Sequence, residues 1–210
     1  MSVRRGGMLL LGSQLNWLFQ MKSNRYGQAA VLDTQQLDQL ISALQGRHHQ
    51  VLASVCRYTA CRIGEGRQLV WGNIGANAIV FPKTVTKGKL ASRTIPVTAK
   101  LHEILVTWRA EWGTCGREPK PEDPLFPGRF AGQFLSSRSF MDALERAARE
   151  VGLEGVSSHS FRRSALSSAS ASGIPLAAIR SLSGHADLGT LQRYLEVSQT
   201  AKEQAAAAFA

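Results

Sequence analysis

Residues 157–197 read SSHSFRRSALSSASASGIPLAAIRSLSGHADLGTLQRYLEV, and this stretch decides how the rest of the chain is interpreted. Ser157 or Ser158 can cap a helix, which would place His159 and Arg162 on one face of its first turn. The start of a helix offers free N–H groups and a positive dipole, so an imidazole and a guanidinium there make a site for a phosphate. A solvated basic helix start is the alternative interpretation of this motif taken alone.

The same stretch ends with a lone tyrosine. His185 and Tyr194 lie nine residues apart, on either side of Asp187, a candidate helix N-cap. A buried stripe is expected on this last helix, formed by Leu188, Leu191 and Leu195. Because Tyr194 neighbours the stripe without replacing it, it is either a packed ring or a phenol available for chemistry.

Two upstream segments carry further charged residues. In ACRIGEG, residues 60–66, Arg62 and Glu65 are three apart, so the carboxylate can orient the guanidinium toward an anion, or the two can form an ordinary surface pair. Residues 77–98 are rich in β-branched side chains around the turn TKGK and predict an antiparallel hairpin. Lys87 and Lys89 lie in this turn. A lysine near a phosphate can act as a general acid once neighbouring arginines lower its pKa.

The remaining pattern is helical. Helical spacing of apolar residues predicts the following helices: one capped by Asp33 or Thr34 and running to about residue 44, then 49–60, 99–112, 136–151, 160–172, 175–182 and 187–196. Gly173 suits the end of one helix and Pro175 the first turn of the next. The fold class is therefore mainly α with a small antiparallel β-sheet, an α+β arrangement.

Composition narrows the functional classes. Lys and Arg number 25 against 15 Asp and Glu, and the pI is near 10.2, which points to a polyanionic partner, most simply nucleic acid. A basic protein that never binds DNA is the alternative interpretation of the charge alone. Cys56, Cys61 and Cys115 lack metal-ligand or disulfide spacing, so we expect a reduced, cytoplasmic protein. No segment approaches the ~20 apolar residues of a membrane span.

Taken together, the motifs resemble those of one family. The chain resembles the catalytic domain of tyrosine recombinases, the phage-integrase family of lambda-type integrases and Xer-type recombinases. The family motif (T)GLRxxEL is matched by TACRIGEG, HxLRH by HSFRR, LLGH by LSGH, and a hairpin lysine before a strand ending in IP by TKGKLASRTIP. The intervals from His159 to Arg162, Arg162 to His185 and His185 to Tyr194 are 3, 23 and 9 residues, as in the family. The match covers residues from about 33 to 200.

The resemblance implies a fold and a mechanism. The expected fold is that of the tyrosine recombinase catalytic domain, the DNA breaking-rejoining enzymes. The expected activity is site-specific recombination, in which Tyr194 attacks a phosphodiester to form a 3′-phosphotyrosyl link, without metal, ATP or another cofactor. The implied catalytic residues are Arg62, Lys87, His159, Arg162, His185 and Tyr194, with Glu65 in support. Lys89 is the alternative to Lys87, which stands at the mouth of the turn.

The resemblance also implies partners and organisation. We expect double-stranded DNA as substrate and a homotetramer on paired sites. Residues 1–30 would be a basic lead-in without a separate core-binding domain, residues 31–198 the catalytic domain, and residues 199–210 a helical tail. The alternatives are a DNA-binding remnant that regulates sites and a type IB topoisomerase-like enzyme. A metal-dependent nuclease is disfavoured, because the sequence shows no acidic cluster for magnesium.

Overall fold

The first two helices of the described chain begin at defined caps. The computed structural model describes residues 28–86, 91–113, 118–185 and 187–192, together with residues 203, 206 and 207. Helix α2, Thr34–Ala43, starts at Asp33, whose carboxylate accepts the Gln36 N–H at 2.8 Å, while the Gln36 side chain accepts the Asp33 N–H at 3.0 Å. The predicted Asp33 cap is thereby confirmed. Helix α3, Arg47–Thr59, starts two residues earlier than predicted, because Gly46, at φ 87°, turns the chain just before it.

A short helical turn and a hairpin follow. Helix α4, Ile63–Gly66, is a single turn, and the 3-10 helix η1 spans Trp71–Asn73. Strands β1, Ala78–Phe81, and β2, Arg93–Pro96, pair antiparallel, with Ala78 opposite Pro96 and Phe81 opposite Arg93. The predicted hairpin is confirmed, whereas residues 87–90 of its turn lie outside the described part.

The second half of the described chain is helical. Its helices are α5 (Ala99–Gly113), α6 (Ser137–Glu150), α7 (Ser158–Ala171), α8 (Leu176–Ser183) and α9 (Leu188–Gln192). Gly173, at φ 75°, ends α7 as predicted, but Pro175 is the N-cap of α8 and not a residue of its first turn. Helix α9 follows Asp187 as expected, and its predicted extension to 196 lies outside the described residues. Within the described ranges, no helix is long and apolar enough to cross a bilayer.

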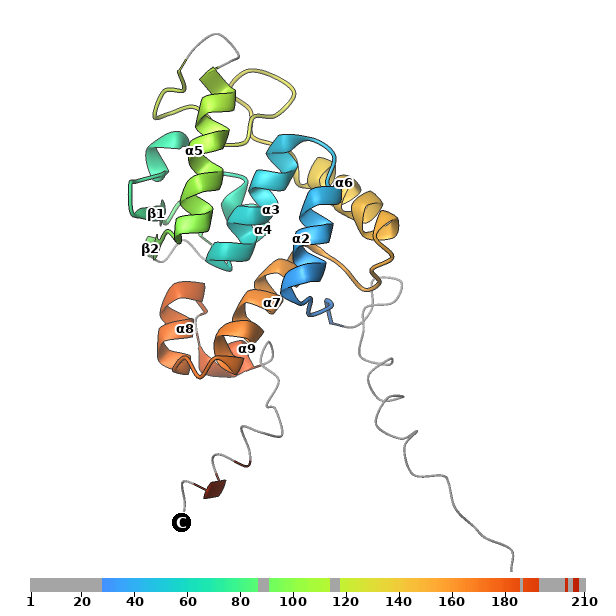
Figure 1. Ribbon diagram of the computed structural model, residues 1–210. Coiled ribbons are helices and arrows are strands. Elements are labelled where there is room, and N and C mark those ends of the chain that lie inside the picture. The colour runs from blue at the N-terminus through green and yellow to red at the C-terminus, as the bar shows by residue number, and fades with distance from the viewer. Residues whose placement is uncertain are drawn as a thin grey trace, which may run out of the picture.

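The main core surrounds α3. This helix packs against α2, α5 and α7, and the hairpin lies beside α5 (Figure 1). The inner residues of α3 are fully buried, among them Val51, Leu52 and Val55. Leu125 and Phe126, from the connection between α5 and α6, fill the same core, and the Trp108 indole N–H donates to the Leu125 carbonyl at 3.0 Å.

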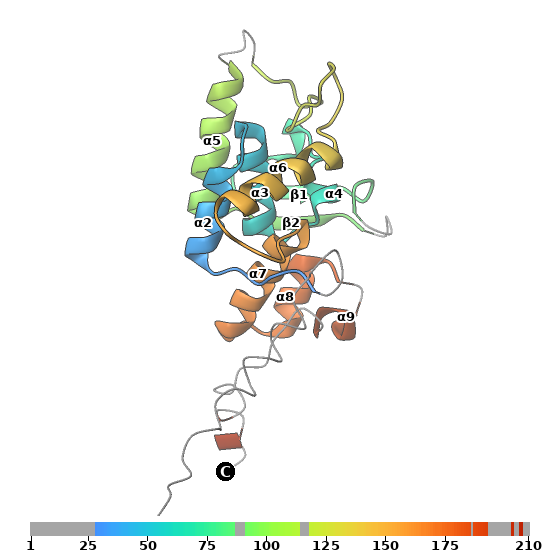
Figure 2. The same ribbon diagram turned by 90° about the vertical axis from the view of Figure 1, so that its right-hand side faces the viewer.

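A second, smaller core lies at the C-terminal side. Helix α7 extends from the main core toward α8 and α9, which Figures 1 and 2 place together at the lower end of the molecule. Here Leu166 of α7, Ile179 of α8 and Leu191 of α9 pack on Ala60, the residue that follows α3. The segment 60–62 therefore lies where the two cores meet, and this junction carries the site.

Candidate anion-binding site

A cleft between the hairpin and α8 collects charged side chains from three separate segments. Its volume is about 430 Å³, and its lining includes Arg62, Glu65, Thr86, Arg93, Arg180 and His185. A neighbouring hollow of about 310 Å³ is lined by Arg62, Arg162 and His159 among others. The structure thus brings together, at two adjoining hollows, five of the residues that the sequence predicted for the site: Arg62, Glu65, His159, Arg162 and His185.

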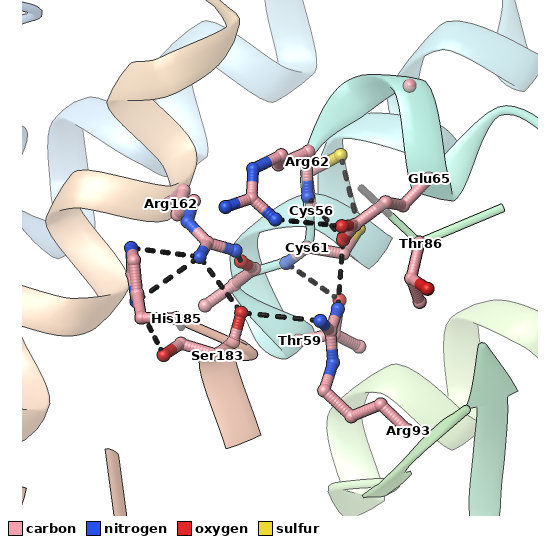
Figure 3. A network of polar contacts seen from close by, with 12 residues as sticks. Cys56, Thr59, Cys61, Arg62, Glu65, Thr86, Arg93, Arg162, Ser183 and His185 are labelled. Carbon is pink, nitrogen blue, oxygen red and sulfur yellow. Dashed lines mark hydrogen bonds and ion pairs between the residues drawn. The ribbon is translucent and has the colours of Figure 1, made fainter. Parts of the chain in front are cut away.

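Glu65 is the anchor on the hairpin side. Its side chain is only 2% exposed, and its two oxygens accept from Arg62 Nη1 at 2.9 Å and from Arg93 Nη2 at 2.9 Å (Figure 3). The Arg62 backbone N–H also donates to it, at 3.1 Å. Burial acts to raise the pKa of the Glu65 carboxyl, but the charge and hydrogen bonds of Arg93, with those of Arg62, outweigh it and lower the pKa. Glu65 therefore forms a buried clamp, in which its carboxylate binds both Arg62 and Arg93, and its contact with Arg62 is not an ordinary surface ion pair.

Arg93 is a member of the site that the sequence reasoning missed. Arg93 is the first residue of β2, and 9% of its side chain is exposed. Its guanidinium binds Glu65, donates to the Ser183 carbonyl at 3.3 Å, and lies over the Phe81 ring. The strand pattern could have predicted that Arg93 points inward, because alternate residues of a strand share a face and Arg93 is two residues from the buried Ile95. An arginine on the inward face of a strand requires a buried partner.

Arg162 is the most enclosed of the arginines. It is 1% exposed, and its guanidinium donates to the Ala60 carbonyl at 2.6 Å and to the Ser183 carbonyl at 2.8 Å. The same Nη2 atom lies 3.0 Å from Nε2 and 3.3 Å from Nδ1 of His185. Ala60 itself is the C-cap of α3 and adopts a left-handed conformation, at φ 50°. The planar fork is thereby held between the loop after α3 and the end of α8.

His185 completes the far side of the cleft. It follows Gly184, whose φ of 67° ends α8 in the left-handed region. Burial, followed by the charges of Arg162, Arg62 and Arg93, lowers the pKa of His185 to about 4. The ring is consequently neutral near pH 7, in contact with a guanidinium.

His159 occupies the neighbouring hollow. Ser157 is the N-cap of α7, as one of the two predicted caps, so His159 stands on its first turn and Arg162 at the start of the second. His159 is exposed, whereas Arg162 is buried. Both line the hollow that Arg62 also lines, so the expected shared face of the helix is observed.

Three residues of the predicted set or its alternatives lie outside the described part: Lys87, Lys89 and Tyr194. Described residues lie on both sides of the turn that carries the lysines and shortly before Tyr194. Thr86 and Ala91, which flank the turn that carries the lysines, line the cleft. Leu191, three residues before Tyr194, is fully buried against Ala60 and Leu166.

The arrangement is suited to binding an anion. Three guanidinium groups converge on the junction and one carboxylate faces them, which leaves a net positive charge at the cleft. Preorganised arginine donors of this kind bind phosphate oxygens well. Within the ranges that the structure describes, no group of three or more His, Cys, Asp or Glu side chains is placed to hold a metal ion. Fold and site together define a helical domain with an arginine-rich cleft of net positive charge.

Comparison with known proteins identifies the family to which this chain belongs. The phage integrase family matches residues 30–201, which is most of the chain. The tyrosine recombinase XerC of Bifidobacterium longum is 31% identical over 123 residues, covering 55% of this chain and 34% of that protein. XerD of Listeria monocytogenes is 26% identical over 179 residues, covering 82% of this chain and 60% of that protein.

A solved structure shares the fold. The XerH site-specific recombinase, in its post-cleavage complex with the palindromic difH substrate, is similar with a TM-score of 0.68 at 21% identity, over 88% of this chain and 54% of that one. The chain belongs to the phage integrase family and has the tyrosine recombinase catalytic fold. It spans between about a third and three-fifths of the length of these relatives.

Proposed function

We propose that this chain cleaves and rejoins double-stranded DNA at specific sites through a 3′-phosphotyrosyl intermediate. The observation that carries the proposal is the convergence of Arg62, Arg93 and Arg162 on two adjoining hollows, with Glu65 binding both Arg62 and Arg93. The names of the relatives, tyrosine recombinases, and the DNA substrate of the XerH complex support the same activity.

In the proposed reaction, Arg62 and Arg162 bind the two non-bridging oxygens of the scissile phosphate. One oxygen would replace His185 as a neighbour of Arg162 Nη2. Attack by a phenol oxygen gives a phosphorane-like state with additional negative charge. Because the guanidinium groups are already oriented by Glu65 and by backbone carbonyls, they stabilise this charge without reorganisation.

Proton transfers complete the step. The Tyr194 oxygen forms a bond to phosphorus as the bond from phosphorus to the 5′ oxygen breaks, and the tyrosine proton passes to His159. Lys87 donates a proton to the departing 5′ oxygen, with His185 as a further hydrogen-bond donor to the phosphate. The phosphotyrosyl link conserves the phosphodiester, so a second 5′ hydroxyl can reverse the step. Four subunits on paired sites would exchange strands in this way.

A covalent-trapping experiment tests the proposal and identifies the target site at the same time. The full chain is incubated with nicked duplexes that contain a randomised segment, and complexes that survive denaturant are recovered and sequenced. We expect enrichment of a defined site, loss of the complex in Tyr194→Phe, and no effect of EDTA. Arg62→Ala and Arg162→Ala should each reduce the rate of trapping by ~10²-fold or more.

Other outcomes would replace the proposal. Site-specific binding without a covalent complex indicates a DNA-binding remnant. Covalent trapping without sequence preference, together with relaxation of supercoiled DNA, indicates a topoisomerase-like enzyme. Cutting that EDTA abolishes and Tyr194→Phe leaves intact indicates a metal-dependent nuclease.

A further inference from the structure

Ser183 makes contacts with two arginines and with the histidine of the cleft. It is the last residue of α8 and is fully buried. Its carbonyl accepts from Arg162 Nη2 at 2.8 Å and from Arg93 Nη1 at 3.3 Å. Its hydroxyl lies 2.7 Å from His185 Nδ1 and 3.3 Å from the Arg180 carbonyl (Figure 3). The backbone of Ser183 thus holds the arginines, and its side chain is available to act on the ring.

The direction in which the Ser183 hydroxyl donates its hydrogen bond determines which ring nitrogen of His185 carries the proton. A serine hydroxyl donates one hydrogen bond and can accept two. When it donates to the Arg180 carbonyl, its oxygen accepts the Nδ1–H of His185, and Nε2 presents a lone pair. When it rotates to donate to Nδ1, the proton of the neutral ring must be on Nε2.

The surroundings favour the first arrangement in the free protein. The positively charged Arg162 Nη2 lies 3.0 Å from Nε2 and 3.3 Å from Nδ1, so its closer contact favours a lone pair on Nε2. The Ser183 oxygen, 2.7 Å from Nδ1, can accept an N–H on that nitrogen. Among the described residues, the other charged groups near the ring include Arg62, Arg93 and Asp187, and the Arg180 Nε donates to the His185 carbonyl at 3.3 Å. Most of these are cations, which keep the ring neutral.

We propose that Ser183 is a positioning residue that selects the tautomer of His185. In the free protein it holds the proton on Nδ1, and rotation of its hydroxyl when an anion enters the cleft leaves the proton on Nε2, directed at the anion. The exchange between the two ring nitrogens is a neutral tautomerisation through water in the open cleft, so no net charge is gained. The second half of this inference rests on the proposed function, whereas the first half concerns the free protein alone.

The residue type matters for this role. The LLGH motif that the sequence resembles has leucine where this chain has Ser183. A leucine has no hydrogen-bonding group and cannot choose between the ring nitrogens. This chain therefore has a control on His185 that the quoted motif lacks.

The test measures the ring nitrogens directly. Long-range 15N–1H NMR of the full chain at pH 7.5 identifies the protonated nitrogen of His185. We expect Nδ1 to be protonated in the wild type, both nitrogens to give averaged signals in Ser183→Ala, and Ser183→Thr to restore the wild-type pattern. Ser172→Ala is the matched control, because Ser172 also stands at a helix end and donates to a carbonyl, at 3.0 Å, but is exposed. It should leave His185 unchanged.

The outcomes separate this inference from the proposed function. A folded Ser183→Ala protein with the wild-type His185 pattern, or a wild type with its proton on Nε2, would overturn the inference whatever the covalent assay shows. Inorganic phosphate is then titrated into the wild type, and binding is followed at the Arg62 side-chain signals. Retention of the proton on Nδ1 in the phosphate-bound state would contradict the proposed rotation of the Ser183 hydroxyl. Arg62 side-chain signals that do not change on addition of phosphate would contradict the anion-binding site itself.

Discussion

On the hairpin side of the cleft, Arg62 and Arg93 are held by the buried carboxylate of Glu65, whereas on the α8 side Arg162 is held by the carbonyls of Ala60 and Ser183. The first arrangement depends on a single charge. The second depends on the backbone conformation of two chain segments. The same planar guanidinium group is therefore oriented by charge on one side and by loop geometry on the other, so different substitutions should disrupt the two sides.

The largest expected effect is on the hairpin side. Glu65→Ala leaves two arginines without the carboxylate they share, and removal of one partner from a buried ion pair costs about 3 to 5 kcal/mol. Urea denaturation measures this loss. Glu103→Ala is the matched control, because Glu103 also pairs with a basic residue three positions away, Lys100, but both side chains are more than 60% exposed. It should cost about 0.5 kcal/mol or less, and equal losses in the two variants would contradict the clamp.

The next largest loss of stability is expected at Gly184, where the hairpin side and the α8 side of the cleft are in contact. Gly184 adopts φ 67°, and a Cβ there would lie 2.2 Å from Arg93 Nη1. Gly173 has a similar φ of 75° with nothing within 4 Å of the added atom. We expect Gly173→Ala to cost about 1 kcal/mol from the backbone alone and Gly184→Ala about 2 to 3 kcal/mol.

A double-mutant cycle isolates the Arg93 contribution. When Gly184→Ala is combined with Arg93→Ala, the added Cβ no longer meets the guanidinium, so the combined cost should be less than the sum of the two single costs. Additive costs would show that Arg93 does not limit the space at Gly184.

The third effect is a dependence on pH from the α8 side. The pKa of His185 is about 4 in the folded chain and near 6.5 when unfolded, so between these values the unfolded chain binds more protons. The contribution of the neutral ring to stability is therefore complete above pH 6.5 and is lost as the pH falls toward 4. Because the ring borders an open cleft, we expect a loss of about 2 kcal/mol.

His185→Gln provides the comparison, since glutamine does not titrate. The difference in unfolding free energy between wild type and this variant should decrease as the pH falls from 6.5 to 4.5. A difference that stays constant across this interval would contradict a neutral, buried His185.

The smallest effect concerns the loop that supports Arg162. Ala60 adopts φ 50°, where glycine is favoured, so Ala60→Gly should stabilise the chain by about 0.5 kcal/mol after loss of its methyl contacts. Ala165→Gly, in the middle of α7 and packed on the same small core, should destabilise by about 1 kcal/mol. Destabilisation by both substitutions would indicate that packing at Ala60 outweighs its backbone strain.

Much of the fold could be predicted because local patterns agree with tertiary packing. The Asp33 cap, the hairpin and the Gly173 corner each depend on a few neighbouring residues, and the structure confirms all three. The predicted start of α3, at residue 49, is two residues late, because the helix begins directly after Gly46, at φ 87°, which the spacing of apolar residues does not indicate.

The site was predictable to the extent that its motifs have fixed spacing. Arg62, Glu65, His159, Arg162 and His185 lie at adjoining hollows, as expected. Arg93 and the Ser183 hydroxyl were missed, because their roles arise from contacts between segments 28 and more residues apart or from the end of a helix. The catalytic roles of all these residues, with Lys87 and Tyr194, remain predictions.

The most direct test of the central claim is a crystal structure of the Tyr194→Phe chain bound to the duplex recovered by covalent trapping with the wild type. We expect the two non-bridging oxygens of the scissile phosphate to lie within hydrogen-bonding distance of Arg62 and Arg162, and the ion pair between Glu65 and Arg93 to be unchanged. A duplex bound on another face of the domain, with no phosphate between these arginines, would contradict it.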